Sequence, residues 1–210
     1  MVSDQFTLGH MSGVGAIVGS QIGKLFSKGQ AEENKQVEDV KFSGFMKVFN
    51  DNILATTLIM TVFLGGICLF AGKDIVQSYA GETDWLLWSA FLGIQFAVGI
   101  TVLLTGVRMM LAEIVPAFKG ISEKVIPGAV PALDMPVFFP LAPTAAVLGF
   151  IATFAGELLG MAILLVTGAP VLVIPGVIPT FFDGGVLGVF ANHFGGRRAV
   201  IVSGLVVGAV

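Results

Sequence analysis

Two long uncharged segments dominate the hydrophobic pattern of the chain. Residues 52–72 and 85–107 contain no Asp, Glu, Lys or Arg. A helix needs about 20 predominantly apolar residues to cross the hydrocarbon core of a bilayer, so we predict a transmembrane span in each segment. Trp85 and Trp88 lie at one end of the second segment, and their amphipathic rings favour the membrane interface.

Prolines change the pattern after Lys124. They recur in an apolar stretch at Pro127, Pro131, Pro136, Pro140 and Pro143. An interior proline removes a helical hydrogen bond and clashes with the preceding turn, so no continuous helix is expected there. Non-helical backbone at membrane depth occurs only where protein buries it or water reaches it. We therefore expect a re-entrant or broken helix over residues 125–143, around Asp134.

The last third of the chain repeats this alternation. A third span is predicted over residues 144–168, with Glu157 inside it. Further prolines then interrupt an apolar stretch that ends near Asp183, and we expect a second re-entrant segment over residues 170–183. Residues 199–210 are apolar but too few to cross a ~30 Å core, so we expect a truncated span of a longer protein.

The region before the first span is a charged surface connection. Residues 24–51 hold five Lys and five acidic residues. Within it, apolar side chains fall near helical spacing at Phe42, Phe45, Met46, Val48 and Phe49. This spacing predicts an amphipathic helix lying at the membrane interface, and a plain polar linker is the alternative.

Composition agrees with a membrane protein. Hydrophobic residues make up 55% of the chain and charged residues 12%, with a mean hydropathy of +0.93, whereas soluble domains are about one quarter charged. The 28 glycines suit helices that pack closely in lipid. The predicted fold class is therefore an all-α integral membrane protein. The net charge of −3, with scattered basic residues, argues against nucleic acid as a partner.

Ionisable residues inside apolar segments are the candidates for function. Asp134 is the most informative, because a charged group at membrane depth is costly and interrupted helices commonly build a transporter site. The alternative is that Asp134 caps a short helix or lies at the interface. Glu157 could serve a pathway or bond to a neighbouring helix. His10 could bind a polar ligand, although a lone His is more often structural.

No motif for catalysis or for a bound cofactor accompanies these residues. Two His and one Cys give no metal-ligand spacing, and neither a phosphate-binding loop nor a nucleophile elbow is present. Binding and translocation of a ligand, without metal or cofactor, is the simplest interpretation.

Several stretches together resemble a known family. They are PGAVPALDMPVFFPLAPTAAVLGF from Pro127 to Phe150, IPGVIPTFFDGGVLGVFANHFGGRRA from Ile174 to Ala199, GVRMMLAEIVPAFKGIS from Gly106 to Ser122, FNDNILATTLIMTVF from Phe49 to Phe63, and LGH from Leu8 to His10. The chain resembles the membrane IIC subunit of the bacterial ascorbate phosphotransferase system, and the matching stretches are collinear over nearly its whole length.

The resemblance implies a homodimeric carrier in the bacterial inner (plasma) membrane, built from two inverted repeats. Because family members are about twice as long, we expect residues 1–210 to represent the second repeat, without the N-terminal half and the C-terminal end. The carrier would bind L-ascorbate. The cytoplasmic IIB subunit, charged by IIA, would phosphorylate it, so the translocation subunit itself would not be an enzyme.

The resemblance also implies substrate-binding residues. The family uses the His of the LGH stretch, a Gln after it and the Asp of the proline-rich hairpin, which here are His10, Met11 and Asp134. Met11 replaces an amide with a thioether that hydrogen-bonds poorly, so a related sugar acid or a polyol remains an alternative substrate. Asp134 would also repel an ascorbate monoanion unless the anionic edge points elsewhere or the carboxyl is protonated.

Two other functions stay open from the sequence. One is an ion- or proton-coupled secondary transporter that uses Asp134 and Glu157 as a relay. The other is a truncated remnant or assembly subunit that does not transport.

Overall fold

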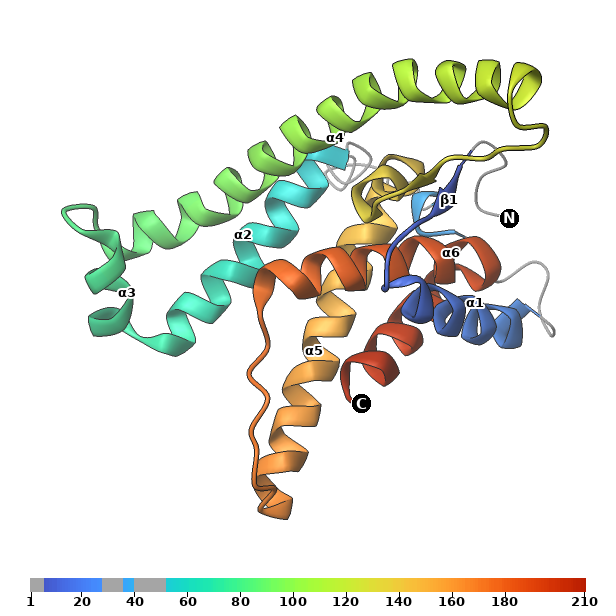
Figure 1. The fold of residues 1–210 in the computed structure, drawn as a ribbon. Coiled ribbons are helices and arrows are strands. Elements are labelled where there is room, and N and C mark those ends of the chain that lie inside the picture. Colours follow the sequence, from blue (N-terminus) through green and yellow to red (C-terminus); the bar gives the residue numbers. More distant parts are fainter. Residues whose placement is uncertain (1–5, 28–35, 40–51) are drawn as a thin grey trace. The chain divides into compact units, whose positions relative to one another are not determined.

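The computed structural model describes residues 6–27, 36–39 and 52–210 (Figure 1). Two compact units divide the chain, one formed by residues 1–40 with 106–210 and the other by residues 41–105. The predicted interfacial helix with Phe42, Phe45, Met46, Val48 and Phe49 lies outside the described residues. Nearly all of the described structure is helical, as the all-α class predicts.

The unit of residues 41–105 contains a bent pair of helices. Helix α2 (Asn52–Ala71) covers the first predicted span, and α3 (Lys73–Ala80) follows after Gly72 at a bend of 116°. Gly72 has a φ of 90°, which a residue with a side chain rarely adopts. Helix α4 (Trp85–Lys124) then begins where Asp84 Oδ1 accepts a hydrogen bond of 2.9 Å from the Leu86 amide.

Helix α4 is longer than the predicted span of residues 85–107. It runs for 40 residues through Pro116 to Lys124 and crosses the division between the two units. Arg108 limits the uncharged segment, but a charge does not end a helix in the way that a turn residue does. Among the described helices, α4 and α5 are long and apolar enough to span a membrane, and the bent α2–α3 pair would make a third span.

The other unit packs three helices through small residues. These are α1 (Gly13–Ser27), α5 (Pro143–Thr167) and α6 (Val177–Gly208). A Cβ added to Gly149 of α5 would lie 2.3 Å from the Gly184 carbonyl oxygen of α6. A Cβ added to Gly195 of α6 would lie 2.3 Å from the carbonyl oxygen of Gly23 in α1. These backbones are therefore in direct contact, as expected for helices that associate in lipid.

Aromatic side chains fill the core of this unit. Phe138, Phe139, Phe150 and Phe181 are buried, and the rings of Phe139 and Phe181 meet edge to face at 5.3 Å. Large apolar side chains are nevertheless exposed on the long helices. Val166 of α5 is 88% exposed and Val102 of α4 is 68% exposed, which suits a lipid-facing surface and supports a membrane location.

The proline-rich segment forms a short strand followed by a tight helix. Strand β2 (Ala132–Leu133) pairs in parallel with β1 (Thr7–Leu8), and the 3-10 helix η3 (Met135–Leu141) follows it. The β1 strand supplies hydrogen-bond partners for the peptide groups of this segment. Figure 1 shows β1 beside the yellow segment that leads into α5.

The second re-entrant segment, expected over residues 170–183, is replaced in part by a helix. The chain is extended before Gly176, and α6 then begins at Val177 and includes Asp183. Pro179 sits in the first turn of α6, where a backbone N–H has no helical partner, so it does not break the helix. The break comes instead at Gly196 (φ 66°, ψ −164°), just before the segment predicted as a truncated span.

Candidate functional site

The β1–β2 pairing brings two distant sequence motifs together. The Thr7 amide donates to the Pro131 carbonyl at 2.9 Å, and the Gly9 amide donates to the Leu133 carbonyl at 2.8 Å. Because the strands are parallel and Leu8 is in register with Leu133, the chain leaves both strands at the same end. His10 and Asp134 are therefore the next side chains beyond the paired strands.

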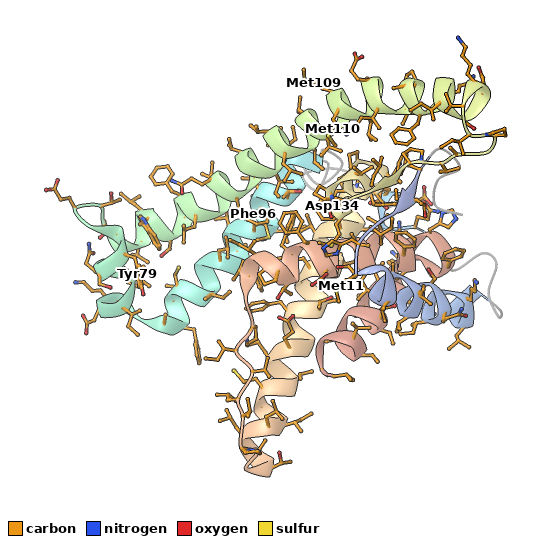
Figure 2. The ribbon with its side chains drawn as sticks, in the orientation of Figure 1. Met11, Tyr79, Phe96, Met109, Met110 and Asp134 are labelled. Atoms are coloured by element: carbon orange, nitrogen blue, oxygen red, sulfur yellow. The ribbon has the colours of Figure 1, made fainter. Side chains whose placement is uncertain are left out.

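Asp134 caps the 3-10 helix that follows it. Its Oδ1 accepts a hydrogen bond of 2.8 Å from the Met135 amide, and the side chain is exposed. Within the described part of the chain, no donor contacts its other oxygen, Oδ2. Asp134 therefore does cap a short helix, which was the alternative role considered from the sequence. Its second carboxylate oxygen makes no such bond. Figure 2 labels Asp134 on the ribbon between β2 and α5.

His10 belongs to a chain of three polar side chains. Its Nδ1 lies 2.8 Å from Ser12 Oγ, and Ser12 Oγ donates to Asp183 Oδ1. The Ser12 amide also donates to His10 Nδ1, at 3.2 Å. The direction of the contact between Nδ1 and Ser12 Oγ depends on the His10 tautomer. His10 is held in one orientation, and its Nε2 stays available.

Met11 lies between these groups without a packing role. Its side chain is 90% exposed, just before α1 begins (Figure 2). The position that differs from the family pattern is therefore one that a ligand could reach. Nothing in the packing around it requires a methionine.

A cavity of about 540 Å³ opens beside His10 and Met11. Its volume is in the range of sites for small molecules. The lining residues are His10, Met11, Ser12, Gly15, Thr153, Glu157, Val173, Asp183, Leu187, Val207, Gly208 and Val210. Asp134 is not among them, so the structure brings two of the three predicted site residues to this cavity and places the third at the end of the adjoining strand.

Glu157 enters the site through α5. Its Oε2 accepts a hydrogen bond of 2.7 Å from Thr180 Oγ1 of α6, and its side chain lines the cavity. From the sequence, Glu157 could belong to a transport pathway or bond to a neighbouring helix. The hydrogen bond to Thr180 joins it to the neighbouring helix α6. Its position at the cavity is also compatible with a role in a pathway.

Sequence reasoning missed three polar residues of the cavity. Ser12, Thr153 and Asp183 all line it. Asp183 is the last residue of the re-entrant segment predicted over residues 170–183, whereas it lies inside α6. A carboxylate in an apolar, glycine-rich helix was a usable signal for it. Ser12 and Thr153 carry no such signal, because single hydroxyl side chains are common in turns and helices.

A larger cavity of about 830 Å³ lies elsewhere in the same unit. It is lined mainly by apolar and aromatic residues, with Lys24 at its edge, and contains none of His10, Met11 and Asp134. We therefore place the candidate site at the smaller cavity, where the polar groups converge. Among the described residues, no group of three or more His, Cys, Asp or Glu side chains could hold a metal ion.

Comparison with known proteins identifies the family. A family model described as "PTS system sugar-specific permease component" matches residues 1–210. The ascorbate-specific PTS system EIIC component of Mycoplasma pneumoniae is 29% identical over 238 aligned positions, which cover 97% of this chain and 34% of that protein. The chain thus spans about a third of the length of that relative. Since the family model matches the whole chain, this protein belongs to the sugar-specific permease components of the phosphotransferase system.

Proposed function

We propose that this protein takes part in binding and translocating L-ascorbate, or a related sugar acid, as the permease component of a phosphotransferase system. The observation that carries the proposal is the β1–β2 pairing, which sets His10 and Met11 beside the strand that leads to Asp134. The name of the Mycoplasma relative supports ascorbate as the first substrate to test.

The chemistry of these groups suits a polyhydroxylated ligand. The oriented imidazole of His10 offers Nε2, and Asp134 offers one carboxylate oxygen beyond its capping bond. A carboxylate accepts strong, charge-assisted hydrogen bonds from hydroxyl groups. The adjoining cavity adds further acceptors, so a sugar-sized molecule can be held by several polar contacts at once.

Family membership makes this chain part of a transport component. In our proposal, the phosphoryl group comes from the IIB subunit, which receives it through IIA, and the substrate is phosphorylated as it is released. A homodimer in the plasma membrane of a bacterium is the proposed assembly. Because the chain covers a third of its relative, substrate and partners are proposals for the whole transporter.

A proton-coupled transporter is the second candidate, and the geometry favours it less. That mechanism was expected to use Asp134 and Glu157 as a relay. Glu157 lines the 540 Å³ cavity, whereas Asp134 does not. The two carboxylates therefore do not both line this cavity.

Equilibrium binding of radiolabelled L-ascorbate to membrane vesicles that contain the protein tests the proposal. The Asp134→Asn variant keeps an oxygen for the Met135 amide, so η3 stays capped while the charge is lost. Losing a charged hydrogen bond is expected to weaken binding by at least about tenfold. Asp74→Asn, an exposed change on α3, serves as the control and should bind as the wild type does. Equal affinity of the Asp134→Asn variant would exclude this residue from the site.

A further inference from the structure

The charged side chains of the 540 Å³ cavity are all carboxylates. Glu157 of α5 and Asp183 of α6 line it, and no Lys or Arg is among its lining residues in the described part of the chain. An anion that entered would meet repulsion without a compensating cation. The field of this cavity therefore favours an uncharged group that donates hydrogen bonds.

Each carboxylate has one oxygen engaged and one open. Glu157 Oε2 accepts from Thr180, and Asp183 Oδ1 accepts from Ser12. No donor within the described residues reaches Glu157 Oε1 or Asp183 Oδ2. The bonds from Thr180 and Ser12 orient the two carboxylates, so that the open oxygens are acceptors in fixed positions.

Thr153 of α5 also lines the cavity, and its side chain is 4% exposed. Its Oγ1 is buried and lies 2.8 Å from the position that a Cβ on Gly184 of α6 would take, so the hydroxyl faces the α5–α6 contact and not the cavity. We therefore assign no ligand contact to it.

The rest of the wall is apolar. Val173, Leu187 and Val207 line it together with Met11. A hydroxylated carbon chain presents C–H groups as well as O–H groups, and the apolar side chains match the former. A bare inorganic ion has no apolar groups that could pack against this surface.

We propose that Glu157 and Asp183 bind the uncharged, hydroxyl-bearing end of the substrate. This inference rests on the proposed function and assigns specificity-determining residues to it. The hydroxylated side chain of the sugar acid enters the acidic cavity, and the anionic ring edge points away from it.

Analogues of the substrate test this assignment. Binding of L-ascorbate is compared with binding of 5,6-dideoxy-L-ascorbate, which keeps the anionic ring and lacks both side-chain hydroxyls. The comparison is made for wild type, Glu157→Gln, Asp183→Asn and the double variant. Gln and Asn keep an oxygen for the Thr180 and Ser12 hydroxyls, so the helices remain bonded. Glu82→Gln and Asp74→Asn are exposed controls outside the cavity.

The expected result is that the variants no longer distinguish ascorbate from the dideoxy analogue as wild type does. Wild type and the controls should bind the dideoxy analogue at least about tenfold more weakly than ascorbate, since charge-assisted hydrogen bonds are lost. The double variant should bind the two ligands within about threefold of each other. If the ratio of the two affinities were the same in wild type and in all variants, the assignment would be overturned. Equal binding of the two ligands by wild type would also overturn it.

Failure of the proposed function has a different signature. Wild-type protein that binds neither ascorbate nor its analogue would reject the substrate class itself. Strong ascorbate binding without coupling to Glu157 or Asp183 would keep the proposed function and reject only the role of these two carboxylates.

Discussion

The side chains of Glu38 and Asn192 are joined by a hydrogen bond of 2.7 Å across 154 positions of sequence. Glu38 Oε1 also accepts from the Ala145 amide at 2.8 Å, in the first turn of α5. In return, Asn192 Oδ1 accepts from the Val37 amide at 2.9 Å. Ala142, which precedes α5, has no side chain that could cap the helix. Glu38 therefore supplies a cap from a distant segment.

Exchanging the two groups tests this contact. In Glu38→Gln, two amide NH₂ groups face each other, and turning either amide leaves another donor or acceptor without a partner. Asn192→Asp instead brings two carboxylates together. Each single variant should lose about 1–3 kcal/mol of stability. The double variant Glu38→Gln/Asn192→Asp restores every donor–acceptor pair and should recover most of the loss.

Thermal unfolding of the purified protein in detergent measures these effects. Asp39→Asn, next to Glu38 and exposed, is the matched control. If the double variant were as unstable as the sum of the single variants, the reciprocal contact would be disproved.

Close packing of α5 against α6 makes a second prediction. An added Cβ at Gly149 would lie 2.3 Å from the Gly184 carbonyl oxygen, and backbone atoms cannot yield as a flexible side chain can. Gly149→Ala should lower stability by about 1–3 kcal/mol or more through overpacking. Gly120→Ala in α4, where nothing lies within 4 Å of the added Cβ, should be neutral or stabilising. Resistance of the helices to limited proteolysis is the measurement, and equal behaviour of both variants would contradict the interface.

The Met11 position predicts a gain of binding. Met11 is exposed at the cavity beside His10, so a polar side chain of similar length can replace it without disturbing the core. Met11→Gln adds a donor and an acceptor and should strengthen L-ascorbate binding by about 2- to 12-fold, the range of one neutral hydrogen bond. Met11→Leu, which keeps the apolar character, should have no effect. Titration calorimetry distinguishes them, and an unchanged affinity in Met11→Gln would mean that the residue does not contact substrate.

Ser12 links His10 to Asp183, and removing its hydroxyl should release the imidazole. Ser12→Ala is expected to weaken ascorbate binding by about 2- to 12-fold, while Ser12→Thr keeps the hydroxyl and should retain most of the affinity. Binding by Ser12→Ala at the wild-type level would show that the orientation of His10 does not depend on this chain of bonds.

The sequence predicted the long helices well because their signal is local. The uncharged segment 52–72 and the observed helix Asn52–Ala71 nearly coincide, and α4 begins at the predicted Trp85. The sequence predicts that the proline-rich segment forms no continuous helix, but it does not predict the pairing with β1. That pairing joins Gly9 to Leu133, and the hydrophobic pattern of a two-residue strand carries no information about a partner so far away.

The candidate site was predicted only in part for the same reason. His10, Met11 and Asp134 came from the family resemblance, and Asp134 also from its place in an apolar segment. Asp183 ends the predicted re-entrant segment because prolines usually interrupt a helix, whereas Pro179 in the first turn of α6 is compatible with a helix. The sequence gives no sign that Thr153 and Ser12 line the cavity, and only the folded structure shows it.

The most direct test of the proposed function is uptake of radiolabelled L-ascorbate into membrane vesicles that contain the protein, with and without phosphorylated IIB. The proposal predicts that ascorbate phosphate accumulates only when phosphorylated IIB is present, and that Asp134→Asn abolishes this accumulation while Asp74→Asn does not. Uptake of unmodified ascorbate that is independent of IIB, and that stops when the proton gradient is collapsed, would contradict it and establish a proton-coupled transporter instead.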